Sequence, residues 1–226
     1  MSASTILIWV IMAAVMFASL YIQKKLTSRI QQYSQVGAPL TGAQIAEKML
    51  AENGIRDVKI VSIEGQLTDH YNPSTRTVNL SRDVYYGQNI AACAVAAHEC
   101  GHVLQHAGGY FPLRVRSALV PIVNFSNKVV PWVLLAGVLL IQVVPELLWL
   151  GIALFGITTL FSVITLPVEI NASSRAVKYL EMTGVATYET KEMAADALKW
   201  AAYTYVIAAV SSLATLLYYV SMARRS

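Results

Sequence analysis

The sequence predicts a mainly α-helical, membrane-embedded protein with about four transmembrane helices and one small α/β domain. Of its 226 residues, 56% are hydrophobic and only 13% are charged, whereas soluble domains average about 25% charged residues. Four apolar runs approach the roughly 20 residues that a membrane-spanning helix needs. Between the first two runs lies a long polar stretch in which helix and strand signals alternate. The sequence contains no basic patch with interleaved aromatic residues, so nothing in it suggests a nucleic-acid partner.

The four apolar runs divide the chain, and they cover residues 6–22, 129–144, 147–167 and 201–222. The first run predicts an uncleaved anchor rather than an export signal, because it lacks a basic start and a clear cleavage site. Pro145-Glu146 separates the two middle runs, which predicts a tight transmembrane hairpin. The predicted organisation is an N-terminal anchor (1–23), an α/β region (24–128), the hairpin (129–168), a helix on the same side (169–200) and a C-terminal transmembrane helix (201–226).

The distribution of lysine and arginine predicts the orientation in the membrane. Basic residues collect between residues 23 and 128 and again after the hairpin, whereas residues 1–5 and the Pro145-Glu146 turn carry none. Both basic segments of this multi-pass protein are therefore expected to face the cytoplasm. Arg224 and Arg225 then lie outside if the last run spans, so the side of the C-terminus stays open.

The polar stretch predicts a small α/β unit. Thr41 and Gln44 form a capping box at a helix start, and Gly54 fits the helix end. Strands are predicted over residues 58–63 and 76–81, with a turn-rich loop at 69–74 between them. Another helix is expected to begin near residues 87–90.

This second helix carries a His-Glu-x-x-His motif, with His98, Glu99 and His102 at its fixed positions. Residues four apart lie on one face of a helix, so both imidazoles can reach a single metal ion. Glu99 lies about 100° round the helix and can reach a water on that metal. Zinc binds imidazole nitrogen, and a catalytic zinc site keeps one position open for water. The motif therefore predicts one Zn²⁺ and a hydrolase.

The surroundings of the motif favour a metal over a surface helix with two histidines and a salt-bridging glutamate. Alanine and valine flank the motif on both sides, so the helix is expected to be mostly buried. Histidine and glutamate are costly to bury unless they are paired or bound to metal. Gly101 is unfavourable in a helix and indicates close approach of another backbone or of a substrate. Cys93 and Cys100 are expected to be free buried thiols, with Cys100 pointing away from the histidines.

The two histidines need a third ligand. His106 lies roughly 12 Å along the same helix from His98, too far to share a metal with both motif histidines. His70, in the turn-rich loop, can fold over the site. Glu169 is favoured, because two membrane crossings return the chain to the side of His98, and a carboxylate at the end of an apolar run is costly without a partner.

The residues that follow Glu169 support this choice. Ala172, Ser173 and Ala176 are small, and at helical spacing they would let their helix pack closely on the motif helix. The alternative without metal is a carboxylate that reaches the membrane interface beside Arg175. His70 also stays open as the third ligand.

Three blocks of sequence resemble the bacterial YugP-like membrane zinc metallopeptidases over almost the whole chain. They are Asp-His-Tyr-Asn-Pro at 69–73, Ala-His-Glu-Cys-Gly-His at 97–102 and Leu-Pro-Val-Glu at 166–169. More distantly the chain is similar to the HtpX and CAAX prenyl protease gluzincins, whose third ligand is a glutamate after a membrane hairpin. The resemblance implies a minigluzincin-like domain and a peptidase of the plasma membrane. That group usually has aspartate where Ser173 stands, so Ser173 or Asn171 is expected to orient a histidine ligand instead.

The predicted reaction is hydrolysis of a peptide bond, in a peptide or membrane-protein substrate at the cytoplasmic membrane face. Glu99 takes a proton from the attacking water and passes it to the leaving amine. A second electrophile is also needed, and its candidates are Arg175, His70 and Tyr71. The strand before the motif helix either pairs with an extended substrate or is an ordinary core strand, and its residues are Thr77, Val78, Asn79 and Leu80.

Two other functions stay open. One is a non-catalytic, zinc-stabilised membrane scaffold or adaptor that presents other membrane proteins to a protease. The intact Glu99 argues against it, because a structural zinc site has no need of this glutamate. The other is hydrolysis of a non-peptide amide. The sequence leaves undecided which proteins are cut, whether the chain forms homo-oligomers and whether it requires a membrane-protein partner.

Overall fold

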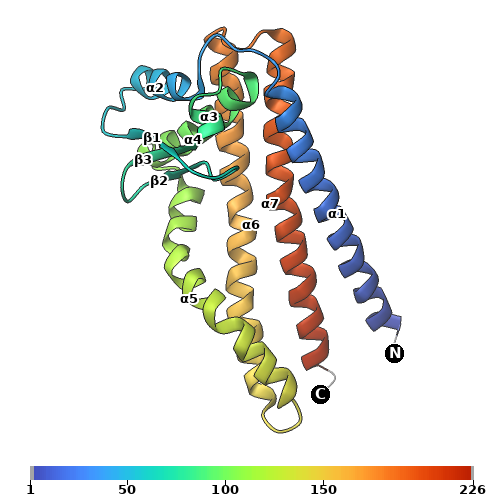
Figure 1. The fold of residues 1–226 in the computed structure, drawn as a ribbon. Coiled ribbons are helices and arrows are strands. Elements are labelled where there is room, and N and C mark those ends of the chain that lie inside the picture. The colour runs from blue at the N-terminus through green and yellow to red at the C-terminus, as the bar shows by residue number, and fades with distance from the viewer. Residues whose placement is uncertain (1–2, 225–226) are drawn as a thin grey trace. The chain divides into compact units, whose positions relative to one another are not determined.

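The computed structural model describes residues 3–224 and is mainly helical, with one small sheet (Figure 1). Met1, Ser2, Arg225 and Ser226 lie outside the described residues. Arg225 is one of the two arginines for which the sequence leaves the side of the membrane undecided. The predicted mixture of long helices and a small α/β part is confirmed. The elements are α1 (Ala3–Tyr33), α2 (Gly42–Glu52), β1 (Lys59–Ile63), β2 (His70–Asn72), β3 (Thr77–Ser81), α3 (Arg82–Tyr85), α4 (Ile90–Ala107), α5 (Phe111–Leu139), α6 (Pro145–Met182) and α7 (Tyr188–Ala223).

The chain divides into two compact units. A helical unit contains the segments up to Tyr21, Arg114–Leu166 and from Thr204 onward. An α/β unit contains Ile22–Leu113 and Pro167–Tyr203. The α/β unit thus joins segments that the sequence assigned to two separate regions, 24–128 and 169–200, while residues 114–128 belong to the helical unit.

Four helices, α1, α5, α6 and α7, are long and apolar enough to cross a membrane. Each is longer than the apolar run that predicted it, because polar helix-forming residues extend a helix without extending its hydropathy. The start of the helix differs most for α5, which begins at Phe111 and not at residue 129. The turn of the hairpin is at residues 140–144, so the prediction that Pro145-Glu146 forms it is wrong. Pro145 is the first residue of α6, a position that suits proline because its missing N–H is not needed there.

Pro167 does not end α6, although the apolar run stops there. The helix continues through the proline to Met182, so the residues that follow Glu169 keep helical spacing. Although proline removes one backbone hydrogen bond from a helix interior, α6 is continuous here. Glu169 therefore projects from the interior of a long helix and not from the start of a new one.

The C-terminal end of α1 is held within the α/β unit by α7. Tyr33 is buried and its hydroxyl donates to Asp196 Oδ2 at 2.9 Å. Arg29 Nε lies 3.1 Å from the same carboxylate oxygen. These contacts give the polar extension of α1 a packing partner, which explains why the helix runs past residue 23.

The first helix of the α/β unit is the one that the capping box predicted. Thr41 Oγ1 accepts from the backbone N–H of Gln44, and the Gln44 side chain accepts from the backbone N–H of Thr41. At the other end Gly54 has φ +73°, a left-handed conformation that glycine adopts without strain. The apolar face of α2 packs on α4, and its buried residues include Ile45, Ala46, Met49 and Leu50.

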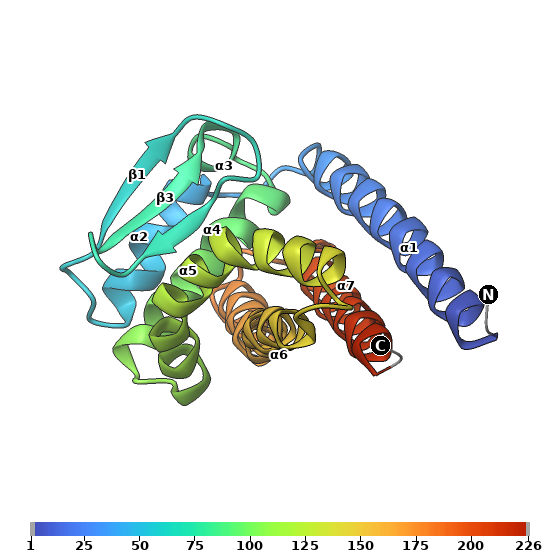
Figure 2. The ribbon, with the colours of Figure 1, turned by 90° about the horizontal axis from the view of Figure 1, so that it is seen from below.

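The sheet has the strand order β1-β3-β2, with β1 parallel and β2 antiparallel to β3. Figure 2 shows β1 and β3 side by side, with α2 next to them. The segment around Tyr71, predicted as loop, is the edge strand β2. Because β3 is paired on both sides, it has no free backbone edge for a substrate. The predicted substrate pairing is therefore wrong for Thr77, Val78, Asn79 and Leu80, of which Val78 and Leu80 are fully buried in the core.

The motif helix α4 begins where the sequence predicted. Asn89 is its N-cap and accepts from the backbone N–H of Ala92 at 2.9 Å. Gly101 lies against α6 so closely that a Cβ at this position would be 2.7 Å from the carbonyl oxygen of Ala172. The predicted close approach of another backbone at Gly101 is thus confirmed. It allows α6 to lie directly against the motif helix.

Candidate metal centre

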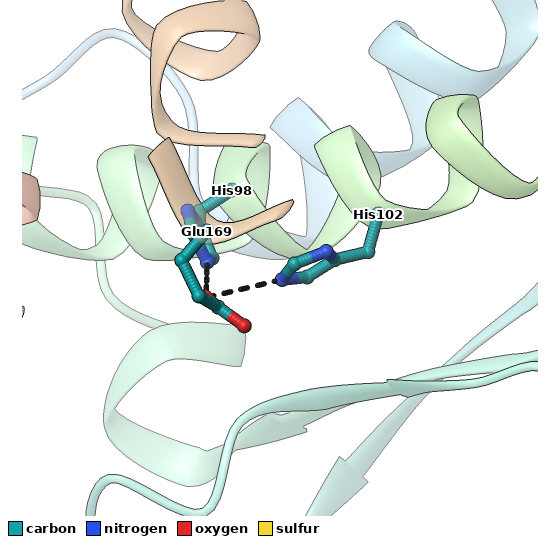
Figure 3. Close-up of side chains that lie close together, drawn as sticks. All are labelled: His98, His102 and Glu169. Carbon is teal, nitrogen blue, oxygen red and sulfur yellow. Dashed lines mark hydrogen bonds and ion pairs between the residues drawn. The ribbon is translucent and has the colours of Figure 1, made fainter. Parts of the chain in front are cut away.

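His98, His102 and Glu169 meet within the α/β unit (Figure 3). Glu169 Oε2 is 3.2 Å from His98 Nε2 and 3.5 Å from His102 Nε2. The two imidazoles come from successive turns of α4, and Figure 3 shows the glutamate reaching them from α6. One ligand atom from each of the three residues lies within 4.8 Å of the others. The sequence motif and the distant glutamate therefore form one cluster.

The donor set fits a zinc ion. Two ligand atoms about 2.0–2.1 Å from a tetrahedral zinc are roughly 3.3 Å apart, and the carboxylate-to-imidazole separations of 3.2 and 3.5 Å are close to this value. Glu169 is only 2% exposed. Among residues 3–224, no lysine or arginine forms an ion pair with it. A buried carboxylate flanked only by imidazoles is favourable when a cation compensates its charge.

The electrostatics of the cluster also favour positive charge. Burial by itself lowers the pKa of His102, but the hydrogen bond with Glu169 and the charge of Glu99 outweigh it and raise that pKa. The imidazole thus attracts a proton more strongly than in water. A divalent cation at the same place benefits from the same carboxylates.

Each histidine has a second hydrogen bond at Nδ1, on the side away from Glu169. Ser173 Oγ lies 3.1 Å from His98 Nδ1. Gln105 Oε1 lies 3.0 Å from His102 Nδ1. Such contacts orient the rings of metal-binding histidines. Asn171 accepts hydrogen bonds from Gln105 and Arg175 rather than bonding a histidine directly.

Sequence reasoning missed Gln105. It is fully buried, although glutamine is mostly exposed in folded proteins. The signal that could have revealed it is its position three residues after His102 on a helix whose other face is apolar, since residues three apart are neighbours on a helix.

Glu99 is buried beside the cluster, with 7% of its surface exposed. Its Oε2 accepts from the backbone N–H of Tyr71 in the edge strand β2 at 3.0 Å. Across residues 3–224 no hydrogen bond to Glu99 Oε1 is present. One carboxylate oxygen is therefore anchored, and the other is available to receive a proton.

The other candidate residues lie around this core in different ways. His70 is exposed and contacts Thr68 and Asn79, and it does not belong to the metal-ligating cluster. The Tyr71 hydroxyl lies 3.1 Å from His106 Nδ1. Arg175 Nε donates to Asn171 Oδ1 at 2.8 Å, which places Arg175 behind the ligands.

The two cysteines are buried and unpaired, as predicted. Both thiols face α2 or the segment before it: Cys93 Sγ lies 3.3 Å from Leu40 O, and Cys100 Sγ lies 3.8 Å from Ala46 O. Burial raises the pKa of the Cys93 thiol to about 12, and it raises the pKa of Cys100 as well. Since zinc binds the thiolate, neither residue is suited to complete the cluster.

Fold and site together define a class of protein. Over residues 3–224 it is a mainly helical chain with four candidate membrane spans and a largely buried cluster of two histidines and a glutamate that can hold a metal ion. A family model described as "Putative neutral zinc metallopeptidase" matches residues 8–224, almost the whole chain. The chain therefore belongs to this family.

A similar protein supports the same family assignment. The chain is 44% identical over 204 residues to "Putative membrane protease YugP" of Bacillus subtilis (strain 168), and the match covers 89% of this chain and 90% of that protein. The resemblance to the YugP-like family is thus confirmed. No solved structure is significantly similar to the chain.

Proposed function

We propose that this protein is a membrane-bound zinc metallopeptidase of the gluzincin type, with a minigluzincin-like site formed by His98, His102, Glu169 and Glu99. The observation that carries the proposal is the largely buried cluster of three ligand atoms within 4.8 Å, with the acidic Glu99 beside the two histidines on α4. Its family is described as one of zinc metallopeptidases. The test is zinc content and peptide cleavage by the purified full chain. Metal-free protein is expected to be inactive, and zinc is expected to restore cleavage.

The chemistry divides between the metal and the chain. Zinc at the cluster would polarise the carbonyl group of the scissile bond and lower the pKa of a water toward ~7. Glu99 accepts the proton of the attacking water at Oε1, while the Tyr71 N–H holds Oε2 in place. The same carboxyl group then donates the proton to the leaving amine. Tyr71 thus positions the base through its backbone.

The edge strand β2 is the better candidate for pairing with a substrate. Antiparallel pairing uses one edge of β2 for β3. The Tyr71 N–H leaves the other edge and reaches Glu99. Backbone groups on that edge lie next to the proposed base, where an extended peptide can align its scissile bond.

A cavity of about 710 Å³ in the α/β unit is suited to bind part of the substrate. A volume of this size is typical of ligand sites. Ala91 and Val95 of α4 line it, together with Ile30 of α1 and Tyr86. At 100° per residue, positions 91, 95, 98 and 102 fall within about 60° of one another on the helix surface. Ala91 and Val95 therefore lie on the same stripe of α4 as the two histidines. The cavity begins one helical turn before His98, where it can receive a substrate side chain, and the residues of the metal cluster do not line it.

Replacing Val95 with tryptophan is expected to fill part of this cavity. We expect kcat/KM for peptide cleavage to fall by about tenfold or more, since a cavity side chain that blocks substrate loses binding energy in the transition state. Zinc affinity should stay unchanged. Val61→Trp, on an exposed position of β1, is the matched control. An unchanged kcat/KM in Val95→Trp would show that the cavity is not part of the substrate site.

The active site is proposed to face the cytoplasm, at the membrane surface of a multi-pass plasma-membrane protein. The support is the excess of lysine and arginine in the segments on either side of the hairpin. A cysteine introduced at the exposed Ser74 is expected to react with a membrane-impermeant reagent only after the cells are opened. If the reagent labels intact cells, Ser74 and the active site face the outside of the cell.

The scaffold alternative is not favoured by the site. A closed zinc site with both His70 and Glu169 as ligands would have supported it. His70 instead contacts Thr68 and Asn79. The cluster of three ligands leaves a fourth position for water, which a catalytic site requires.

A further inference from the structure

The two histidines of the metal centre must carry their protons at a particular nitrogen. Both direct Nε2 toward Glu169 and Nδ1 toward a residue behind them. An imidazole can bind a metal through Nε2 only when the proton of its neutral form is on Nδ1. The residue that contacts Nδ1 therefore influences whether the ring is ready to bind metal.

Behind His102, the roles of donor and acceptor can be assigned step by step. The N–H at Arg175 Nε can only donate, so the atom of Asn171 that lies 2.8 Å away is its oxygen. The same oxygen is 3.0 Å from the amide of Gln105, so Gln105 presents its NH₂ group there. That NH₂ group also lies 2.8 Å from the carbonyl oxygen of Val168, which can only accept.

These two acceptors determine the orientation of the Gln105 amide. Its remaining atom, Oε1, faces His102 Nδ1 at 3.0 Å. A carbonyl oxygen only accepts, so this hydrogen bond exists when His102 has its proton on Nδ1. Gln105 is fully buried. An unpaired buried polar group costs about 1–3 kcal/mol, so Gln105 disfavours the state of His102 that has no proton on Nδ1.

His98 is held differently. Its Nδ1 contacts the hydroxyl of Ser173 at 3.1 Å. A hydroxyl can donate as well as accept, so Ser173 is compatible with either tautomer of His98. The two ligands on α4 are therefore not equivalent.

We propose that Gln105 is a positioning residue that keeps His102 in the tautomer whose Nε2 can bind zinc, and that Asn171, held by Arg175, keeps Gln105 in the orientation this requires. The proposal rests on the proposed metal site. It gives Arg175 and Asn171 a role in preparing the metal site from behind, at the end of a chain of three hydrogen bonds. It assigns the buried Gln105 a function beyond packing.

The first test replaces Gln105 with methionine, which is similar in size but cannot accept from His102. Loss of such a contact typically weakens metal binding 10- to 100-fold, and we expect the zinc dissociation constant to rise in that range. It is measured on the purified full chain by competition with a chelator. Gln35→Met is the matched control, because Gln35 is exposed and its side chain donates to the neighbouring Ser34.

The second test observes the tautomer without any metal. The chain has only four histidines, so ¹⁵N-histidine NMR of the zinc-free protein resolves few rings, and a His102→Gln variant assigns the signal. The wild type is expected to show His102 protonated at Nδ1, toward Gln105. In Gln105→Met the neutral ring should instead carry its proton on Nε2, toward Glu169. A purely structural role for Gln105 would leave the tautomer unchanged.

A pair of variants at Asn171 gives an independent test if Gln105→Met does not fold. Asn171→Asp keeps the oxygen that accepts from Gln105 and Arg175, and it should retain wild-type zinc affinity and the His102 tautomer. Asn171→Leu removes that oxygen and should weaken zinc binding several-fold, less than Gln105→Met because Val168 still holds Gln105.

The possible outcomes separate the two proposals. If the wild type binds no zinc, the proposed metal site itself is wrong. If the wild type binds zinc, but Gln105→Met binds it equally well and keeps the His102 tautomer, the positioning role is overturned. Equal zinc affinity and equal tautomer in Asn171→Asp and Asn171→Leu would overturn the role of Asn171 and Arg175.

Discussion

Replacing Glu99 with glutamine is expected to abolish peptide hydrolysis while leaving zinc bound. The glutamine oxygen can still accept from the Tyr71 N–H, which now holds Glu99 Oε2, so the side chain should stay in place. Its other end becomes an NH₂ group, which cannot accept a proton from water. Loss of a general base typically costs 10²–10⁴-fold in rate, and we expect kcat to fall by about this factor.

The measurement is cleavage of a casein-type substrate by purified protein, together with the zinc content of each sample. Glu47→Gln is the control, because Glu47 is an exposed glutamate on α2 and its replacement removes the same charge. Cleavage by Glu99→Gln at the parent rate would refute the assignment of the base. Loss of zinc in this variant would instead show that Glu99 is needed for the metal.

Replacing Glu169 with glutamine is expected to remove zinc binding. The carboxylate is 2% exposed, and it supplies the negative charge that the metal site requires. Breaking a buried charge pair costs about 3–5 kcal/mol, so the zinc dissociation constant should rise at least about 100-fold. Peptide hydrolysis should disappear at the same zinc concentration.

A stability measurement distinguishes this from simple damage to the fold. Zinc that binds only the folded protein raises its melting temperature, and this rise should be lost in Glu169→Gln. The zinc-free melting temperature should change little, since the amide can still accept a hydrogen bond within the cluster. Glu181→Gln, on an exposed turn of the same helix α6, is the control. If Glu169→Gln binds zinc as tightly as the wild type, another residue is the third ligand.

The sequence predicted the ligand cluster because its parts follow simple rules. His98 and His102 are separated by one turn of a helix, which local spacing is enough to establish. Glu169 was reached by counting membrane crossings, a topological argument that needs no tertiary detail. The close approach at Gly101 and the contact of Ser173 with His98 also follow from small residues at helical spacing.

The features of the fold and the site that the sequence did not predict depend on tertiary contacts, which no local pattern encodes. The strand β2 has only three residues, in a segment rich in turn-forming types, and it exists because it pairs with β3. That pairing makes β3 central between β1 and β2, so the strand that the sequence predicted to pair with a substrate has no free edge. Gln105 meets its hydrogen-bond partners Val168 and Asn171, more than 60 positions away, only in the folded chain.

Helix lengths were underestimated for a related reason. Hydropathy detects only the apolar part of a helix, whereas packing determines where the helix ends. The polar end of α1 is held by the pairing of Arg29 and Tyr33 with Asp196 on α7. In the same way α6 continues through Pro167, and the continuation carries Glu169 and Ser173.

The central claim is that one zinc ion is bound by His98, His102 and Glu169. X-ray absorption at the zinc edge of the purified, zinc-loaded protein tests it most directly. The structure predicts one zinc per chain with only nitrogen and oxygen neighbours at about 2.0–2.2 Å, including two imidazoles. A sulfur neighbour near about 2.3 Å, which only Cys93, Cys100 or a methionine can supply, or the absence of stoichiometric zinc would contradict it.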